Sequence, residues 1–597
     1  CSSKFLYNKY SFKFNKDIDV ANYKTDLRDV HFNLFKMCKI QKAAEELGYG
    51  EPELKDIVEQ FDKFVENEIY PTRIPSDEEG VKMVDGNVKV PECFGPLNKK
   101  FYENGWYALG YPEEFGGMPA PHALKIACYS MAIGSNVSWS MYYGLTQGAM
   151  NVIMKVGSQE QKDLYVPKMM EGTWGGTMCL TEAGAGSDVG NANTTAKPIG
   201  NDKYAINGTK IFISSGESDL YENNIHLVLA RLPGAEEGTK GLSLFIVPRF
   251  HINDDGTNGA TNNVRCTKLE EKMGLHAQAT CELTFGQDGE CVGELIGKEN
   301  EGIVNMFIMM NEARLLCGLQ GESQANLSYM LTEQYAKERS QFGTEIINLP
   351  DVKRMLLKMR STSRGLRALC LHTGNLFDSA DKGDEVAEKE IALFTPICKA
   401  FCSDEAFFIS SDAIQTHGGY GYCTEYGIEQ FTRDTKIAAI YEGTNGIQAI
   451  DFVMRKILKD KGETFFAVGK KIQATMQREE AKQFPHEVSM IGKSMEMSEK
   501  VLQKFGKMLA EKNHAGVLAH ATDFQTYCGN LVVAWLLLEH ACEASNELKS
   551  ATGEDDKKYY QSKMDDIKVF CQYQLTRNIG LAHSVLNFEE DLTNITV

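Results

Sequence analysis

Short β-branched runs set between long helical stretches are the feature that most limits the possible folds of this chain. Apolar residues recur at helical spacing from about 25 to 175, and again over 301–340, 350–380 and 384–416. Between 176 and 292 the runs are short, separated by turn residues, and not joined by helical crossovers. This pattern predicts an antiparallel β-barrel or sandwich between helical segments rather than a nucleotide-binding βαβ unit.

The same changes of pattern divide the chain into five parts. At 597 residues the chain is too long for a single hydrophobic core. We predict an N-terminal extension, a helical domain, the β domain, a helical bundle and an additional helical domain, with bounds at 1–45, 46–175, 176–292, 293–460 and 461–597. The expected fold class is α+β and multidomain, with a middle antiparallel β-barrel or sandwich, a C-terminal four-helix bundle and an extra helical domain.

Two local patterns make sharper predictions. The dipeptide Asn207-Gly208 lies between two strand-like runs and favours the two-residue turn of a β-hairpin. The helices of the last domain are expected to break at three residues, Gly462, Pro485 and Gly553.

Charge and hydropathy argue against two classes of function. A formal charge of −19 disfavours a nucleic-acid surface, because phosphate binding needs a positive face. No apolar run reaches the ~18–20 residues that cross a membrane, and the longest, residues 531–538 (LVVAWLLL), is expected to be a buried helix face. We therefore expect neither nucleic acid nor a membrane span.

Cysteine and histidine spacing predicts neither disulfides nor a metal site. The sixteen cysteines are scattered, and several lie inside apolar helical patterns, which indicates buried thiols in a reducing compartment. Neither they nor the twelve histidines show metal-ligand spacing. Residues 1–16 carry four lysines and no acid, as in the tail of an organellar transit segment, with a lipid-modified N-terminal cysteine as the alternative. We expect a cytoplasmic or mitochondrial-matrix protein.

The stretch 433–448 contains the strongest candidate for a catalytic group. One helix is expected to end there and another to begin, with Thr444 or Asn445 as its N-cap, and Asn445 with Gln448 resembles a capping box. Glu442 is then held in the intervening turn beside a glycine, which lets a ligand approach closely. A carboxylate fixed in this way is a candidate general base. An isolated acid near a helix N-terminus more often only complements the helix dipole, so the assignment depends on the rest of the chain.

Four sequence motifs occur in order along the chain. They are LTEAGAGSD at 180–188, NGTKIFISSG at 207–216, QTHGGYGYCTEY at 415–426 and RDTKIAAIYEGT at 433–444. The first could be mistaken for a dinucleotide-binding loop but lacks the strand–turn–helix context. Together the motifs resemble the acyl-CoA dehydrogenase family over roughly residues 50–460. The helical tail is similar to the long branch of that family, which includes 3-methylthiopropanoyl-CoA dehydrogenase-like proteins.

The resemblance implies an FAD site between the β domain and the bundle and across a subunit interface. Phe212 takes the place of a tryptophan that stacks near the flavin in many relatives, and Ser214 takes that of a threonine near N5. Arg339 would pair with the diphosphate of a partner subunit's FAD. One departure is 349–351 (LPD), where many relatives carry His-Gln. The implied FAD contacts are Met178, Cys179, Leu180, Thr181, Ser187, Phe212, Ile213, Ser214, Arg339, Phe342, Gln415, Gly418, Gly419 and Thr444.

The resemblance also implies a site for an acyl-CoA thioester. Arg314 would lie near the 3′-phosphate-bearing end of CoA, or it would only brace its helix. Some relatives take the base from this helix, just before that arginine, but here that residue is Ala313. Glu312 is one position further away and turned by ~100° around the helix, which favours Glu442 as the base. The implied substrate contacts are Ser187, Asn311, Arg314, Tyr441 and Gly443.

The reaction implied by the resemblance is α,β-dehydrogenation of an acyl-CoA to the 2-enoyl-CoA. Glu442 would remove the α-proton while FAD accepts hydride from the β-carbon, and an electron-transferring flavoprotein would take up the electrons. A homodimer or a dimer of dimers is expected. Two alternatives stay open: an acyl-CoA oxidase that uses oxygen, and a DNA-binding flavoprotein related to alkylation-response proteins. The mixed Lys and Glu of 461–597 disfavour the second.

Overall fold

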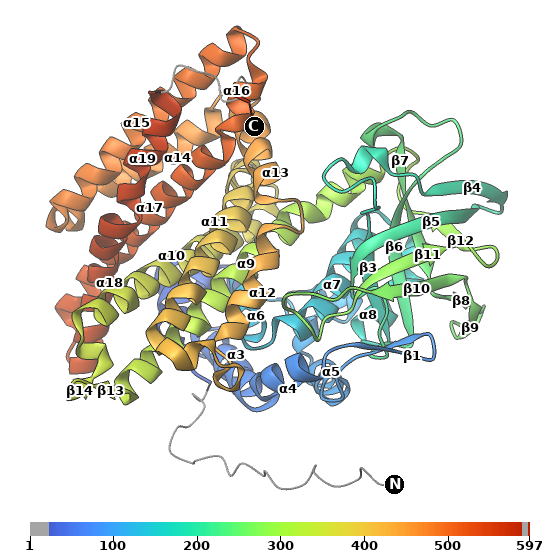
Figure 1. Ribbon diagram of the computed structural model, residues 1–597, viewed down its shortest axis with the longest axis horizontal. Helices are drawn as coiled ribbons and strands as arrows, with labels where there is room; N and C mark the ends of the chain where they lie inside the picture. Colours follow the sequence, from blue (N-terminus) through green and yellow to red (C-terminus); the bar gives the residue numbers. More distant parts are fainter. Residues whose placement is uncertain (1–22, 588–594, 597) are drawn as a thin grey trace, which may run out of the picture.

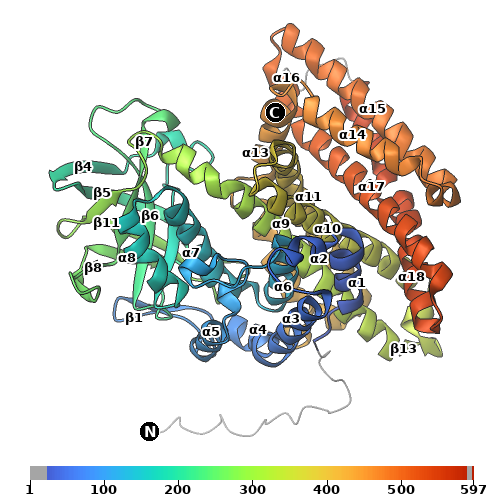
Figure 2. The same ribbon diagram turned by 180° about the vertical axis from the view of Figure 1, so that it is seen from behind.

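The chain folds into a β domain at one end, a helical bundle in the middle and a further group of helices at the other end (Figures 1 and 2). This computed structural model describes residues 23–587 and 595–596. The basic stretch predicted to resemble a transit segment, residues 1–16, lies outside the described residues. The arrangement confirms the predicted multidomain α+β class, and the five-part division remains our proposal for the domains.

The N-terminal part is helical, as its apolar spacing predicts. Helix α3 (Glu51–Phe64) is amphipathic and continues into the π-helix η2 (Val65–Ile69). Helices α6 (His122–Ser135) and α7 (Val137–Val156) are almost wholly buried. The other elements here are α1 (Leu27–His31), η1 (Phe32–Met37), α2 (Ile40–Glu45), η3 (Tyr70–Thr72), α4 (Arg73–Glu79), β1 (Lys82–Val84), β2 (Asn87–Lys89), α5 (Phe94–Glu103), η4 (Trp106–Ala108), η5 (Glu113–Phe115) and α8 (Gln159–Met170).

The β domain is built on an eight-stranded sheet of order β10-β11-β5-β12-β7-β6-β3, with β4 pairing to β5 and β6 beside that path. Its pairs are antiparallel except that β3 and β4 run parallel to β6, so the expected antiparallel sheet needs correction there. The intervening chain is long enough to return in the same direction. The elements are β3 (Trp174–Cys179), η6 (Val189–Asn191), β4 (Thr195–Gly200), β5 (Lys203–Ser214), β6 (Asn223–Arg231), η7 (Thr239–Gly241), β7 (Leu242–Pro248), β8 (Phe250–Ile252), β9 (Asn258–Thr261), β10 (Val264–Leu269), β11 (Thr280–Phe285) and β12 (Val292–Leu295).

The hairpin predicted at Asn207-Gly208 is wrong, because β5 passes straight through both residues. Asn207 pairs with Thr195 of β4, and Gly208 pairs with Phe285 of β11. A Cβ on Gly208 would lie 2.4 Å from Thr194 Oγ1. This glycine therefore lets the segment at Thr194 pack closely against β5 and does not supply a turn.

The three long helices predicted over 301–340, 350–380 and 384–416 are present in the bundle as α9 (Gly302–Glu338), α10 (Pro350–Ala380) and α11 (Glu385–His417). Pro350 is the first residue of α10, where its missing N–H costs nothing. The remaining elements are β13 (Ser340–Gln341), β14 (Thr344–Glu345), η8 (Ile346–Asn348), η9 (Gly418–Tyr422), η10 (Thr424–Tyr426), α12 (Glu429–Thr435), η11 (Lys436–Ala439), α13 (Asn445–Ile450) and the π-helix η12 (Asp451–Leu458).

The C-terminal helices begin where the sequence predicts breaks. Gly462 precedes α14, Pro485 opens α15 and Gly553 precedes α18. The LVVAWLLL segment is buried in the middle of α17, as predicted. These helices are α14 (Glu463–Met476), η13 (Glu480–Gln483), α15 (Pro485–Ala510), α16 (His514–Ala519), α17 (Ala521–Ser550), α18 (Glu554–Tyr573), η14 (Leu575–Arg577) and α19 (Asn578–Leu586).

A buried ion network joins α1, α10 and α18. Asp29 Oδ1 accepts from Lys563 Nζ at 2.7 Å, and its Oδ2 accepts from Arg367 Nη1 at 3.0 Å. Arg364 Nη1 donates to Asp566 Oδ2 at 2.9 Å. Burial alone would raise the pKa of Asp29, but the surrounding cations hold it well below its ordinary value. The network therefore fastens α1 and α18 to α10 of the bundle.

Two further properties concern the whole described structure. Within residues 23–587 and 595–596, no helix combines the length and apolar character that spanning a membrane requires. The cysteines in those ranges are free thiols, and those predicted to be buried are buried: Cys128, Cys317, Cys398 and Cys402.

Candidate active site

Glu442 lies in the turn between η11 and α13, as the sequence predicts. Its φ of +55° is left-handed, a conformation that costs a non-glycine residue about 1–2 kcal/mol, and Gly443 follows at +76°. Thr444 is the N-cap of α13, its Oγ1 accepting from Ile447 N at 3.3 Å. The predicted capping box of Asn445 with Gln448 is therefore wrong. A strained turn of this kind persists only when its surroundings hold it.

Side chains hold this turn before, at and after Glu442. The Tyr441 hydroxyl donates to Gln320 Oε1 of α9. Gln448 Nε2 donates to the backbone oxygen of Glu442 at 2.8 Å. Asn445 points into the bundle, where its Oδ1 accepts from Lys399 Nζ of α11 at 2.8 Å. Because none of these contacts uses the carboxylate, it stays available for a ligand.

The electrostatic surroundings of Glu442 raise its pKa. Desolvation is the main cause, and the charges of Arg314 and Lys399 oppose it without cancelling it. The residue is half-buried. A carboxylate whose pKa moves toward neutrality is suited to accept a proton in catalysis.

Arg314 is placed as a brace. Its Nη1 donates to Asp451 Oδ2 at 2.7 Å, and both side chains are buried. Of the two roles left open by the sequence, this contact supports the bracing of α9 against η12. Asn311, one turn earlier, accepts at Oδ1 from Thr395 Oγ1 of α11 at 3.3 Å.

Glu312 belongs to a different polar cluster, between α6, α7 and α9. Its Oε2 accepts from Asn151 Nδ2 at 2.7 Å, and its Oε1 lies 3.9 Å from Lys125 Nζ. Lys125 is buried, with its ammonium 4.2 Å from the ring centre of Tyr111. These contacts engage the Glu312 carboxylate within the protein and favour Glu442 as the base.

Phe212 forms an exposed aromatic platform on β5. Its φ is +57°, and the β5–β11 register shifts between the pairs Ile213–Cys281 and Lys210–Leu283. Such a bulge re-aims a side chain. Phe212 is 59% exposed, and so is Met273 in the loop before β11. Exposed apolar groups on a strained strand fit a flat aromatic ring such as the isoalloxazine of FAD.

The residues from Met178 to Thr181 run beside this platform. The Thr181 oxygen accepts from Ile211 N at 2.9 Å. The side chains of Cys179 and Ile213 are buried in the core, so these two predicted FAD residues can offer only backbone atoms. The half-buried Met178, Leu180, Thr181 and Ser214 remain available.

The glycine-rich loop after Thr181 is anchored by Glu182. This buried carboxylate accepts from the backbone N–H of Asn193 at 2.7 Å and of Thr194 at 3.0 Å, and from Lys210 Nζ at 2.8 Å. Ser187 is exposed in the loop. A Cβ on either loop glycine would meet open space, so a ligand can approach the backbone at Gly184 and Gly186.

The loop before β11 bonds to the residue after β5 and to the helix that precedes the Glu442 turn. Leu275 N donates to Asp434 Oδ1 at 2.6 Å, which docks this loop on α12 just before the turn. Ser215, directly after β5, donates its N–H to Ala279 O at 2.8 Å. The loop before β11 therefore links the end of β5 to α12, the helix that precedes the Glu442 turn.

The other predicted FAD residues gather at the far end of α11. The Arg339 guanidinium lies 5.4 Å from the ring centre of Tyr420. Phe342 has a left-handed φ and is 93% exposed. At a rise of 1.5 Å per residue, His417 is about 27 Å along α11 from Lys399, which contacts Asn445. These residues, which are Arg339, Phe342, Gln415, Gly418 and Gly419, form a separate exposed surface.

Several residues around Glu442 are not among the predicted site residues. They include Gln320, Lys399 and Asp451, and Gln448 is predicted only as part of a cap. Lys399 had a signal, because it interrupts the apolar run TPICKAFC on α11. A lysine at a core-facing position of a buried helix needs a partner.

Residues 349–351 depart from the His-Gln of many relatives. There Pro350 is the first residue of α10, and Asp351 Oδ1 accepts from Arg354 Nε at 2.8 Å.

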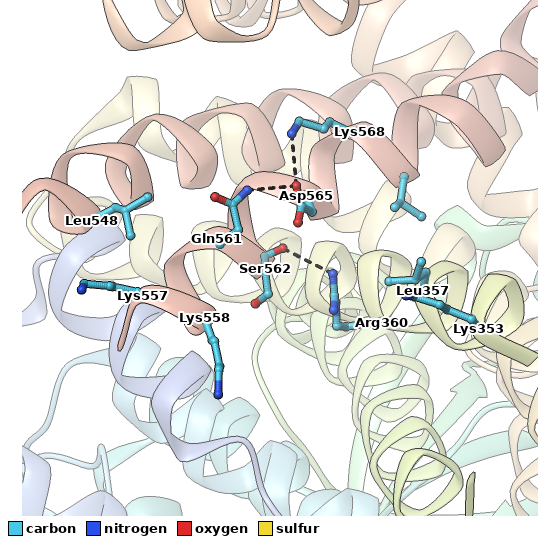
Figure 3. A pocket seen from close by; sticks show the side chains of 11 residues that line it. Lys353, Leu357, Arg360, Leu548, Lys557, Lys558, Gln561, Ser562, Asp565 and Lys568 are labelled. Carbon is cyan, nitrogen blue, oxygen red and sulfur yellow. Dashed lines mark hydrogen bonds and ion pairs between the residues drawn. The ribbon is translucent and has the colours of Figure 1, made fainter. Parts of the chain in front are cut away.

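A groove of about 670 Å³ lies away from Glu442, between α10 and α18 (Figure 3). Its cations are largely paired: Lys568 lies 3.1 Å from Asp565, and Arg360 lies 2.8 Å from Asp566. This groove contains none of the predicted site residues. Among the described residues, no group of three or more potential metal ligands occurs.

The fold and the site together define a class of enzyme. A carboxylate with a raised pKa in the helical part and an exposed aromatic side chain on the β domain are the groups expected of a flavin-dependent oxidoreductase that removes hydrogen beside a carbonyl group.

Comparison with known proteins identifies the family. The acyl-CoA dehydrogenase N-terminal domain matches residues 51–173, its middle domain 177–287 and its C-terminal domain 300–458, and an acetyl-CoA dehydrogenase C-terminal-like domain matches 468–596. This chain belongs to the acyl-CoA dehydrogenase family and is an oxidoreductase.

Relatives match over nearly the whole chain. The 3-methylmercaptopropionyl-CoA dehydrogenase of Ruegeria pomeroyi is 36% identical, over 93% of this chain and 96% of its own. The broad-specificity linear acyl-CoA dehydrogenase FadE5 of Mycobacterium tuberculosis is 34% identical, over 93% and 95%. An acyl-CoA dehydrogenase of Bacillus anthracis solved with FAD has the same fold, at 23% identity and a TM-score of 0.73, over 90% of this chain and 88% of that one. Family membership and this complex support FAD as the cofactor.

Proposed function

We propose that this enzyme converts an acyl-CoA thioester to the 2-enoyl-CoA with Glu442 as the general base. The observation that carries the proposal is the Glu442 carboxylate, which has a raised pKa and is held in a strained turn. When bound there, FAD supplies the acceptor for hydride from the β-carbon.

The residues of the chain orient the substrate and move the proton. Glu442 accepts the α-proton, and its own backbone N–H is positioned to donate to the enolate-like thioester oxygen. Gly443 leaves the thioester free to approach the backbone, since a left-handed glycine adds no side chain there. Arg314 and Lys399 favour the ionised base, while burial keeps it basic enough to react.

We propose a homodimer or a dimer of dimers in which the surface around Arg339 faces the FAD of the partner subunit. Support comes from the exposed Phe342 and from Gly418 and Gly419, where an added Cβ would meet open space. Backbone N–H groups at such glycines suit phosphate. An electron-transferring flavoprotein is the proposed acceptor, and the proposed compartment is the cytoplasm or the mitochondrial matrix.

We expect anaerobic addition of a suitable acyl-CoA to bleach the flavin absorbance of the purified holoenzyme. A panel of acyl-CoA thioesters with short to long acyl chains, including acyl groups that contain a thioether, should show fast bleaching for one group of substrates. A matched panel of free acids should leave the spectrum unchanged, because they lack the activated α-carbon. A colourless protein that cannot be reconstituted with FAD would contradict the proposal.

The same preparation separates dehydrogenase from oxidase. Turnover with an electron-transferring flavoprotein, and little peroxide in air, is the expected result. Stoichiometric peroxide formation would instead assign the enzyme as an acyl-CoA oxidase.

A further inference from the structure

A buried lysine lies behind the turn that carries Glu442. Lys399 has an exposed fraction of 0% and sits in the middle of α11. Its Nζ donates to the amide oxygen of Asn445 at 2.8 Å. Buried lysines usually pair with a carboxylate. A buried lysine held by a neutral amide, close to a candidate base, is therefore unusual.

Asn445 connects this lysine to the base. It is the first residue of α13, three positions after Glu442. Its Nδ2 donates to Ser403 Oγ at 3.0 Å and to the backbone oxygen of Ala400 at 3.3 Å. The lysine and these two atoms of α11 thus fix the start of α13, and with it the position of the preceding turn.

Glu442 is among the charged groups that act on Lys399. Burial lowers the pKa of Lys399, Cys317 of α9, Glu442 and Asp404 of α11 oppose that shift, and Arg314 of α9 adds to it. Arg314 is already compensated by Asp451 at 2.7 Å. Burial raises the pKa of the Cys317 thiol to about 12, so it is neutral. Across the described part of the chain, no carboxylate forms an ion pair with Lys399. In a buried site, a charge without an ion-pair partner acts strongly on its neighbours.

We propose that Lys399 is a positioning residue for the reaction: it fixes the turn of Glu442 through Asn445, and its charge favours the ionised form of that carboxylate. The inference rests on the proposed function, because it requires Glu442 to be the base. It assigns a role to a residue that touches neither substrate nor FAD.

The test measures the rate of flavin reduction by acyl-CoA against pH in the holoenzyme. Lys399→Met should shift the acidic limb of the profile upward by about one pH unit, at the low end of what loss of an adjacent opposite charge produces. The limiting rate should fall several-fold with KM nearly unchanged, because the turn is less well held. Lys399→Gln should show the same shift with a smaller loss of rate, since it keeps a donor for Asn445.

Two further variants separate charge from packing. Asn445→Asp leaves the lysine in place but compensates its charge, so it should also shift the limb upward, and it serves if the lysine variants fail to fold. Ser403→Ala removes a neutral contact from the same helix and should leave the limb where it is. The carboxyl infrared band of Glu442, found by subtraction of the Glu442→Gln spectrum, should titrate in parallel and does not depend on turnover.

The possible outcomes distinguish this inference from the proposed function. If Glu442→Gln still reduces the flavin, the base assignment and the role of Lys399 both fail. If Glu442→Gln is inactive while Lys399→Met and Asn445→Asp keep the wild-type pH profile, only the role of Lys399 is overturned.

Discussion

Glu442→Gln is expected to lower the rate of flavin reduction at least ~100-fold while leaving FAD bound. General-base catalysis contributes roughly 10²–10⁴-fold, and glutamine cannot accept the α-proton. The turn should survive, since Gln448 bonds the backbone oxygen of residue 442 and Thr444 caps α13 without the carboxylate. Stopped-flow absorbance under anaerobic conditions measures the rate, and the visible spectrum reports bound FAD.

The matched control is Glu312→Gln on α9. Its carboxylate is engaged by Asn151 and lies near Lys125, so we expect activity within a few-fold of the wild type. An active Glu442→Gln beside an inactive Glu312→Gln would place the base on α9 instead.

The wild-type pH profile should follow from the raised pKa of Glu442. The base works only when ionised, so kcat/KM should rise with pH through that pKa. Because the pKa is raised, the rise should lie at higher pH than for an ordinary exposed glutamate. A profile that is flat down to the ordinary pKa of glutamate would contradict the burial argument.

Asp29→Asn is expected to destabilise the folded protein by about 3–5 kcal/mol, the usual cost of removing one partner from a buried ion pair. The change leaves Lys563 and Arg367 buried without the carboxylate that both contact. Thermal or denaturant unfolding of the holoenzyme measures the loss. Adding Lys563→Met should restore part of it, because the uncompensated cation is then removed as well.

A partly exposed ion pair between an N-terminal and a C-terminal helix provides the control. Lys36 of η1 lies 2.8 Å from Glu547 of α17, and both side chains remain partly exposed. Lys36→Met should therefore cost less than about 1 kcal/mol. If Asp29→Asn and Lys36→Met lowered the free energy of unfolding equally, burial would not strengthen the network.

Local chemistry explains which elements were predictable from the sequence. Gly462 and Pro485 mark helix starts correctly because a glycine cap and a proline at the first helical position act through the backbone of their own segment. The prediction of a hairpin at Asn207-Gly208 is wrong because that glycine acts through a distant segment and not through its own. Gly208 instead makes room for Thr194, fourteen positions earlier in the chain, which no local pattern reveals.

The candidate site was predictable to a similar extent. Glu442 and its turn follow from the motif, whereas the choice between Thr444 and Asn445 as cap depends on α11, which engages the Asn445 side chain. The function of Lys399 depends on contacts between segments more than forty positions apart. The roles of Cys179 and Ile213 likewise depend on burial, which leaves only their backbone available.

The bond between Asp29 and Lys563 spans 534 positions of the chain. At a synthesis rate of 5–20 residues per second, roughly 30–100 s pass between the synthesis of Asp29 and that of Lys563. Until then Asp29 can pair only with cations of α10 such as Arg367. This buried network can therefore be completed only after almost the entire polypeptide has been made, and its final assembly is expected to be post-translational.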